Sequence, residues 1–209
     1  MRIALLAAVV LALPGCALVE QPTRMVSQTT HDWRAVASST DRERLRDWRS
    51  TFVKALAAAR AAGHGAEIAR EGALLEPDAA LANPSIPNGD YRCRVIKLGA
   101  KAPGLLDYIA YPAFACRVTP HSGLQLLTKL SGSQRPVGLI FPADVVREVF
   151  LGTLALGDEV EAMQYGQDET RNVAGFVERV GPARWRLLMP RPHFESQLDV
   201  MELVPVGGG

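Results

Sequence analysis

The sequence has few of the features that support catalysis. It lacks the Gly-x-Ser-x-Gly nucleophile motif, the His-Glu-x-x-His zinc motif, the phosphate-binding Walker loop and the glycine fingerprint of dinucleotide-binding proteins. Its four histidines occur singly, without a second histidine or a cysteine at metal-ligand spacing: His31, His64, His121 and His193. We therefore expect no catalytic residues, no metal site and no cofactor, and we predict that the protein is not an enzyme.

A large net charge is also missing. The chain has 23 basic and 22 acidic residues, and removal of residues 1–15, which contain Arg2 and no acidic residue, leaves 22 of each. Attraction between basic side chains and phosphates supplies much of the affinity of nucleic-acid-binding proteins. A neutral chain therefore makes nucleic acid a poor candidate for a partner.

An apolar run of eleven residues at 3–13 follows Arg2. Eleven helical residues rise about 16 Å, roughly half of the hydrocarbon core of a bilayer, so the run is typical of a signal peptide and too short for a transmembrane helix. The following Leu13-Pro14-Gly15-Cys16 resembles a bacterial lipobox, although Pro14 is uncommon at its position. The cysteine of a lipobox is lipidated and becomes the first residue of the mature chain. We predict a signal peptide at 1–15 and lipidation of Cys16.

The residue after Cys16 is Ala17 and not Asp. By resemblance to Gram-negative sorting rules, this favours the outer membrane, with the protein facing the periplasm and the lipid anchor making the membrane its partner. The alternative is an ordinary secretory signal that leaves the protein soluble in the periplasm. Both interpretations predict export.

Two cysteines, Cys93 and Cys116, remain once Cys16 carries lipid. An even pair in an oxidising compartment predicts a disulfide, which closes a loop of 24 residues and stabilises the fold by roughly 3 kcal/mol. Each cysteine follows an aromatic residue by two positions and precedes an arginine. On paired antiparallel strands this spacing places the aromatic rings and the sulfurs on one face and the arginines on the other.

The first part of the mature chain is predicted to be a tether followed by helices. Residues 16–38 are polar and have little periodicity, although Trp33 is a candidate to dock on the domain. Thr40 and Glu43 have the spacing of a capping box. An apolar stripe then recurs at three and four residues, which predicts an amphipathic helix over 41–62 whose stripe packs in the core: Leu45, Trp48, Phe52 and Leu56. A second, weaker helical segment covers 66–72.

From residue 90 onward, short apolar runs alternate with turn residues every eight to twelve positions. Nine strands are predicted, of which we expect about eight to be real: 90–98, 106–110, 113–119, 124–130, 137–141, 149–155, 173–180, 184–189 and 198–204. The predicted fold is mainly β (α+β), with the N-terminal amphipathic helix packed on an antiparallel barrel-like sheet. Residues 39–209 are predicted to form one domain, helical over 40–72 and β over 90–205.

Three sets of residues are candidates for function. Arg92, Arg94 and Arg117 are predicted to share the strand face opposite the disulfide, with Lys97 and Lys101 nearby, and form a small basic patch. A solvated strand face is the simpler interpretation of the patch, because three charges do not exceed the usual density of a protein surface.

A turn over 131–135 offers Ser131, Ser133 and Arg135 for insertion into the cleft of a partner, although its composition is also that of an ordinary turn. His193 and Glu195 point the same way on an extended strand, where an acid from the loop 158–169 would complete a hydrolytic site. A loop after two prolines is the simpler interpretation of that segment.

Several segments together resemble an exported bacterial family known as domain of unknown function 4893. They include the strand Tyr91-Arg92-Cys93-Arg94, the run Lys129-Leu130-Ser131-Gly132-Ser133-Gln134-Arg135-Pro136, and Arg184-Trp185-Arg186-Leu187 with Phe194-Glu195-Ser196-Gln197. The resemblance covers residues 33 to 205. It implies no activity, substrate or catalytic residue.

These observations favour a lipid-anchored envelope protein that binds a small ligand or another envelope protein without catalysis. The first alternative is a periplasmic inhibitor of a lysozyme or protease that acts through the turn 131–135. The second is an envelope hydrolase that uses carboxylates. A deep apolar cavity favours the ligand-binding protein. A rigid protruding turn favours the inhibitor, and a cleft with converging acids favours the hydrolase.

Overall fold

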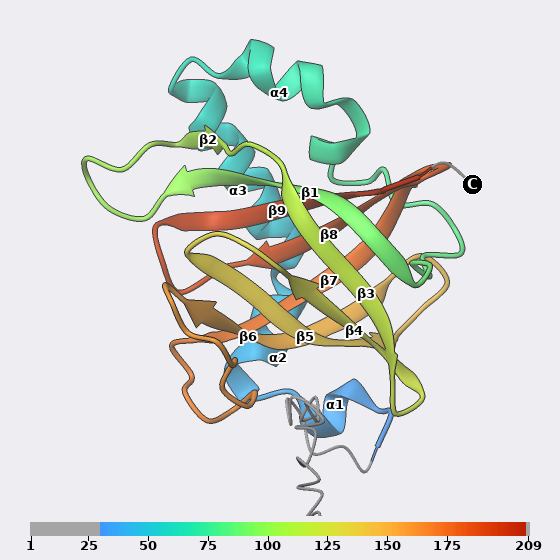
Figure 1. The fold of residues 1–209 in the computed structure, drawn as a ribbon. Helices are drawn as coiled ribbons and strands as arrows, with labels where there is room; N and C mark the ends of the chain where they lie inside the picture. Colours follow the sequence, from blue (N-terminus) through green and yellow to red (C-terminus); the bar gives the residue numbers. More distant parts are fainter. Residues whose placement is uncertain (1–29, 208–209) are drawn as a thin grey trace, which may run out of the picture.

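A closed antiparallel barrel forms the centre of the computed structural model, which describes residues 30–207 (Figure 1). Nine strands follow one another in sequence order around the sheet: β1 (Gly89–Ala100), β2 (Tyr108–Ala110), β3 (Phe114–His121), β4 (Leu124–Lys129), β5 (Gln134–Pro142), β6 (Glu148–Leu156), β7 (Asn172–Gly181), β8 (Arg184–Pro190) and β9 (Ser196–Pro205). The barrel closes where β9 pairs with β1. The predicted lipobox and Cys16 lie outside the described residues.

All nine predicted strands are present, although only about eight were expected to be real. β2 pairs only with Ile96, Lys97 and Leu98 of β1. β3 pairs with the same edge of β1, but only over residues 89–93. β2 therefore stands outside the ring of eight strands, and the loop that contains it projects from the left side of the barrel in Figure 1.

The barrel interior is filled by the alternate side chains of all eight strands, as period two requires. The interior cluster includes the disulfide of Cys93 and Cys116, whose Cα atoms lie 5.9 Å apart. In the β1–β3 register each cysteine lies opposite the aromatic residue that precedes the other, Tyr91 opposite Cys116 and Phe114 opposite Cys93. The predicted disulfide and its inward orientation are confirmed.

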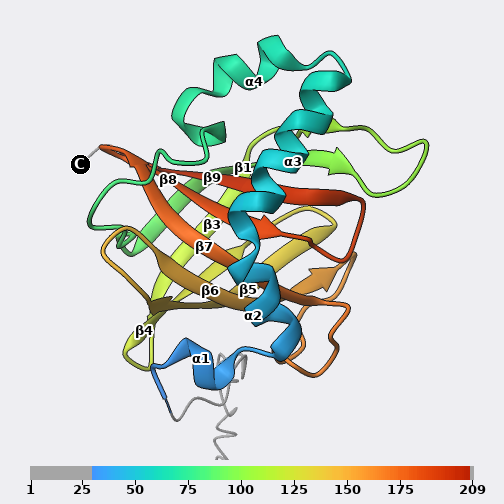
Figure 2. The same ribbon diagram turned by 180° about the vertical axis from the view of Figure 1, so that it is seen from behind.

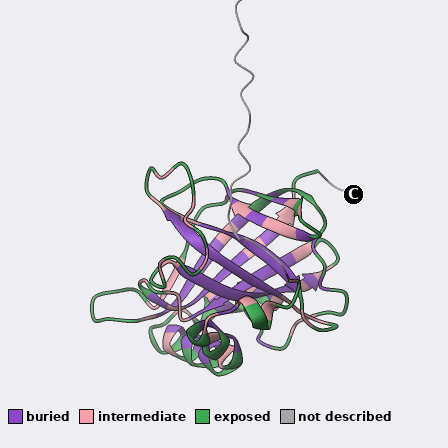
Figure 3. Ribbon diagram, turned by 90° about the horizontal axis from the view of Figure 1, so that it is seen from below, coloured by how far each residue is buried: buried purple, intermediate pink, exposed green. Residues whose placement is uncertain are grey.

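Two interior glycines on neighbouring strands make room for a large ring. A Cβ atom on Gly138 of β5 or on Gly152 of β6 would lie 2.7 Å from the Cζ atom of Phe150. The same Cβ atoms would also overlap the carbonyl oxygens of Leu151 and Val137, respectively, so neither position tolerates a side chain. Figure 3 shows how burial is concentrated on the strands, whereas the connecting loops are exposed.

A helical layer covers part of the outer face of the barrel (Figure 2). It consists of α1 (Trp33–Val36), α2 (Ser39–Arg46), α3 (Trp48–Ala61), α4 (Gly65–Glu71) and the 3₁₀ turn η1 (Gly72–Leu75). Phe52 and Leu56 of α3 are buried against outward side chains of β1, β8 and β9, as predicted. Trp48 contacts this cluster and also the cluster under α1 and α2.

Three details of the predicted helices are wrong. The single helix over 41–62 is two helices, because the backbone leaves the helical region at Asp47. The first of them, α2, contacts β7, whereas α3 reaches β9. The predicted capping box of Thr40 and Glu43 is replaced by Ser38, whose Oγ atom accepts from the amide of Asp41. Helix α1 lies within the predicted tether and packs through Trp33 on the barrel, so the folded part begins before residue 39.

One end of the barrel is closed by the segment 81–88. The indole of Trp185 donates to the carbonyl of Pro84 at 3.0 Å, and the hydroxyl of Tyr91 donates to the carbonyl of Pro87 at 2.5 Å. Ile86 from this segment is buried in the interior cluster. We call this end the closed end.

No helix among residues 30–207 has the length and apolar character that crossing a membrane requires.

Candidate ligand-binding cavity at the open end

The opposite end of the barrel, which we call the open end, contains a cavity of about 210 Å³. The loops 101–113, 130–133, 157–171 and 191–195 connect the strands there. Apolar side chains from five strands and two of these loops make up most of its wall: Val95, Tyr111, Phe114, Leu154, Val173, Met189 and Phe194. An engineered apolar cavity of about 150 Å³ accepts benzene, so this one, of about 210 Å³, has room for roughly eight heavy atoms.

Lys97 contacts the other polar side chains on one side of the cavity. It is buried, and its Nζ atom lies 3.2 Å from Oδ2 of Asp199, 3.0 Å from Oε2 of Glu195 and 3.2 Å from Oε1 of Gln134. Ser196 in turn donates to the other oxygen of Asp199. The three N–H donors of an ammonium are thus matched by three acceptors, two of them carboxylates.

Lys129 has different surroundings. Its Nζ atom donates to the carbonyl of Gln134 at 2.6 Å and lies 4.0 Å from the centre of the Phe114 ring. No carboxylate within residues 30–207 forms an ion pair with it. Gly132, at φ +92°, passes so close that a Cβ atom there would lie 3.0 Å from Nζ.

The pKa values of the two lysines move in opposite directions. Burial by itself lowers the pKa of Lys97, but the attraction of Asp199 and Glu195 outweighs it and raises that pKa. Burial, together with repulsion from Arg135 and Lys97, lowers the pKa of Lys129 to about 8. The cavity therefore holds the ammonium of Lys97, which is paired with two carboxylates, and the ammonium of Lys129, which has no direct carboxylate partner among residues 30–207.

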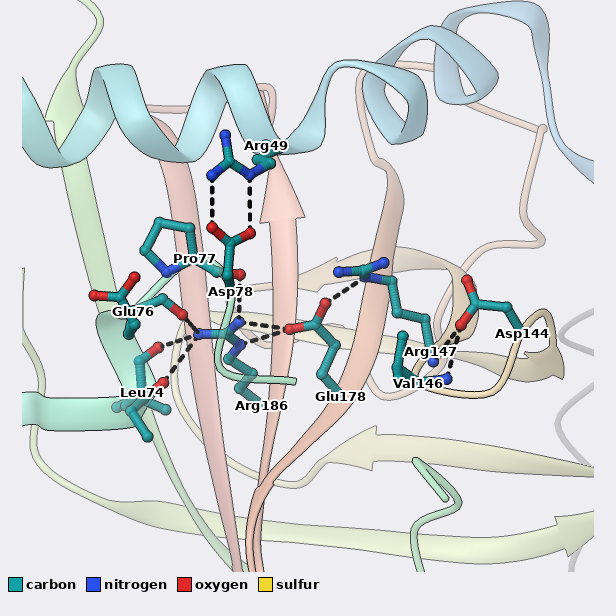
Figure 4. Close-up of polar contacts among 11 residues, drawn as sticks. Arg49, Leu74, Glu76, Pro77, Asp78, Asp144, Val146, Arg147, Glu178 and Arg186 are labelled. Atoms are coloured by element: carbon teal, nitrogen blue, oxygen red, sulfur yellow. Dashed lines mark hydrogen bonds and ion pairs between the residues drawn. The ribbon is translucent and has the colours of Figure 1, made fainter. Parts of the chain in front are cut away.

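A second buried polar cluster lies on the outer face of the barrel, beneath the helical layer (Figure 4). Arg186 of β8 is fully buried and forms an ion pair of 2.6 Å with the equally buried Glu178 of β7, which also binds Arg147 at 2.5 Å. The guanidinium of Arg186 donates to four carbonyl groups of the segment after α4, those of Ala73, Leu74, Glu76 and Pro77. Every nitrogen of the Arg186 guanidinium has an acceptor, so this arginine fastens the helical layer to the barrel.

The predicted basic patch is largely neutralised. Arg94 binds Glu71 at 2.5 Å and Glu202 at 3.0 Å, and Arg117 binds Asp90 at 2.5 Å. Arg92 is exposed and forms no ion pair with another described residue. Lys97, expected near the patch, faces the barrel interior instead, because it follows Cys93 and Val95 at period two.

The turn 131–135 lies at the rim of the cavity. Gly132 and Ser133 line the cavity, and Ser131 is exposed. The guanidinium of Arg135 donates to the carbonyls of Gly132, Gly157 and Glu159 at 2.6–2.7 Å. This arginine fastens the turn to the neighbouring loop and does not extend toward solvent as an inhibitory side chain would.

His193 and Glu195 do not converge, and the residues 191–195 form a loop. Glu195, at φ +56°, pairs with Lys97 in the cavity. His193 lies in a different hollow, beside Asp41, Arg44 and Glu169. The simpler interpretation of this segment is therefore the correct one.

Of the acidic loop, Glu169 lines the hollow of His193, whereas Glu159 does not. The carboxylate of Glu159 binds Arg171 at 2.5 Å and accepts from the amide of Leu156 at 2.8 Å. Among residues 30–207, no group of three histidine, cysteine or acidic side chains is placed to hold a metal ion.

Sequence reasoning did not find Lys129 or Asp199. Their positions in the strands could have indicated them. Lys129 follows the buried Leu127 by two positions and Asp199 precedes the buried Met201 by two, so each shares the inward face of its strand. A charged residue at an inward position near the end of a barrel strand indicates a polar site inside the barrel.

A family model described as Domain of unknown function (DUF4893) matches residues 33–203. No curated protein and no solved structure matches the chain.

Proposed function

The chain belongs to the DUF4893 family, and from the cavity of its barrel we propose that it is a binding module for a small, largely apolar molecule. The single observation that carries this proposal is the open end, where apolar side chains surround a cavity of about 210 Å³ while the closed end is plugged. An eight-stranded barrel has an interior wide enough to hold one small ligand. Largely apolar walls with a few polar groups are typical of ligand sites.

The proposed module acts without catalysis. Lys97 has its three donors occupied, and the hydroxyl of Ser196 donates to Asp199 and does not line the cavity. Among the residues that line the cavity, no hydroxyl or thiol is hydrogen-bonded to a general base, which is the arrangement that activates a serine or cysteine nucleophile. His193, the candidate base of the sequence analysis, lines another hollow.

We place this module in the cell envelope, held by lipid on Cys16 at the periplasmic face of the outer membrane. The support for this part of the proposal is the run of apolar residues 3–13 followed by the lipobox-like sequence. The buried disulfide of Cys93 and Cys116 is in keeping with an oxidising compartment.

Methyl-resolved NMR with 1-octanol as an uncharged probe tests the proposed cavity. The methyl signals of Val95, Leu154 and Val173 are expected to shift with one saturating curve, because these side chains line the cavity. Val53 is the matched internal control, since it is 44% exposed on α3, and its signals are expected to stay unchanged. Shifts that appear equally at Val53, or no shift at any cavity methyl, would argue against the module.

A further inference from the structure

Building on the proposed function, we infer that the bound molecule is an amphipathic anion, a monocarboxylate in the simplest case, whose head group lies against Lys129. Its apolar body, of about eight heavy atoms, occupies the space between the side chains of Val95, Leu154, Val173 and Met189.

The charges that line the cavity support an anionic head group. Asp199 and Glu195 both lie within 3.2 Å of the ammonium of Lys97, so their charges are already used inside the protein. Lys129 is the remaining charged side chain among those that line the cavity, and it forms no ion pair within residues 30–207. A carboxylate placed beside it would give Lys129 a direct ion-pair partner.

The hydrogen bonds of Lys129 lead to the same ligand class. An ammonium has three donors, and the structure satisfies one of them, with the carbonyl of Gln134. The ring of Phe114 covers another side of the ammonium at 4.0 Å. The side chain is only 6% exposed and the remaining donors face the cavity, where the oxygens of a bound ligand would serve as their acceptors.

A cationic ligand fits the same cavity badly. The acceptor it needs is Glu195, and that carboxylate is paired with Lys97 at 3.0 Å. A bound cation would also lie close to two ammonium groups, those of Lys97 and Lys129. An amine of the same chain length is therefore the informative negative probe.

The pKa of Lys129 gives the inference a pH signature. Its pKa of about 8 results from burial and from the neighbouring charges of Arg135 on β5, Lys97 on β1 and, in the opposite sense, Asp199 on β9. The side chain is protonated below pH 8 and loses its charge above it. Affinity for a carboxylate is therefore expected to fall about tenfold between pH 7 and pH 9, whereas affinity for a neutral ligand stays constant.

Isothermal titration calorimetry with octanoate, 1-octanol and octylamine tests the inference. For the parent protein at pH 7, octanoate is expected to bind at least tenfold more tightly than 1-octanol, and octylamine more weakly than either. Lys129→Met keeps the aliphatic stem and removes the charge, so it is expected to lose at least tenfold in octanoate affinity and nothing in octanol affinity. Lys54→Met, at an exposed lysine of α3, is the matched control and is expected to change neither.

The outcomes separate the inference from the proposed function. Equal binding of octanoate and 1-octanol to the parent protein, or tighter binding of octylamine, overturns the anionic head group and leaves the cavity function in place. Failure of all three probes to bind overturns both. The pH series on the parent protein needs no variant, so octanoate affinity that is flat from pH 7 to pH 9 overturns the inference even if Lys129→Met does not fold.

Discussion

The buried ion pair of Arg186 and Glu178 provides a sharp test of how the helical layer is attached to the barrel. Both side chains are fully buried, and Glu178 is also the partner of Arg147. Glu178→Gln keeps the size of the side chain and removes its charge, so two arginines lose the one carboxylate that pairs with them among residues 30–207. Removal of one partner of a buried pair costs about 3–5 kcal/mol. This is a large part of the 5–15 kcal/mol that is usual for a single domain.

Urea unfolding at pH 7, followed by tryptophan fluorescence and far-ultraviolet circular dichroism, measures the loss. Asp78→Asn is the matched control, because it also removes one carboxylate from an arginine of the same region (Figure 4). The Arg49–Asp78 pair is exposed, with 55% and 59% of the two side chains accessible, so its loss is expected to leave the urea midpoint nearly unchanged. Equal shifts for the two variants would refute the claim that the buried pair fastens the layer.

Three further predictions concern the core, the disulfide and the anchor. Phe52→Ala is expected to lower the free energy of unfolding in urea by about 3–5 kcal/mol, because its ring is fully buried. Val53→Ala, on the exposed side of α3, is the control and should cost far less. Similar losses for the two variants would contradict the packing of that helix. Replacement of Cys93 and Cys116 by alanine is expected to cost about 3 kcal/mol, and free thiols in protein recovered under non-reducing conditions would contradict the disulfide. Cys16→Ser is expected to abolish fatty-acid labelling in the native host, and labelling that persists would exclude the proposed lipidation.

The strands and the disulfide were predictable from the sequence because both depend on local patterns. Period-two alternation and regularly spaced turn residues define each strand, and pairing of neighbours in the chain accounts for nearly the whole barrel. Tyr91-Arg92-Cys93-Arg94 and Phe114-Ala115-Cys116-Arg117 carry the same alternation, which predicts that the two sulfurs face one side.

Features that depend on distant contacts were not predictable. Ser38 caps α2 in place of Thr40 partly because the hydroxyl of Tyr165, from a loop more than a hundred residues away, donates to Asp41 at 2.5 Å. The cavity likewise requires Lys97, Lys129 and Asp199 from three strands. The alternation within one strand predicts that a charged residue points inward. It does not predict the partners of that residue, because they come from other strands of the barrel.

The most direct test of the binding account is an intermolecular NOE measurement with isotope-labelled octanoate at pH 7. The account predicts contacts from the octanoate chain to the methyl groups of Val95, Leu154 and Val173, and from its C2 methylene to the ring of Phe114 beside Lys129. Contacts confined to surface methyl groups such as those of Val53, or none at saturating octanoate, would contradict a ligand site in the open end of the barrel.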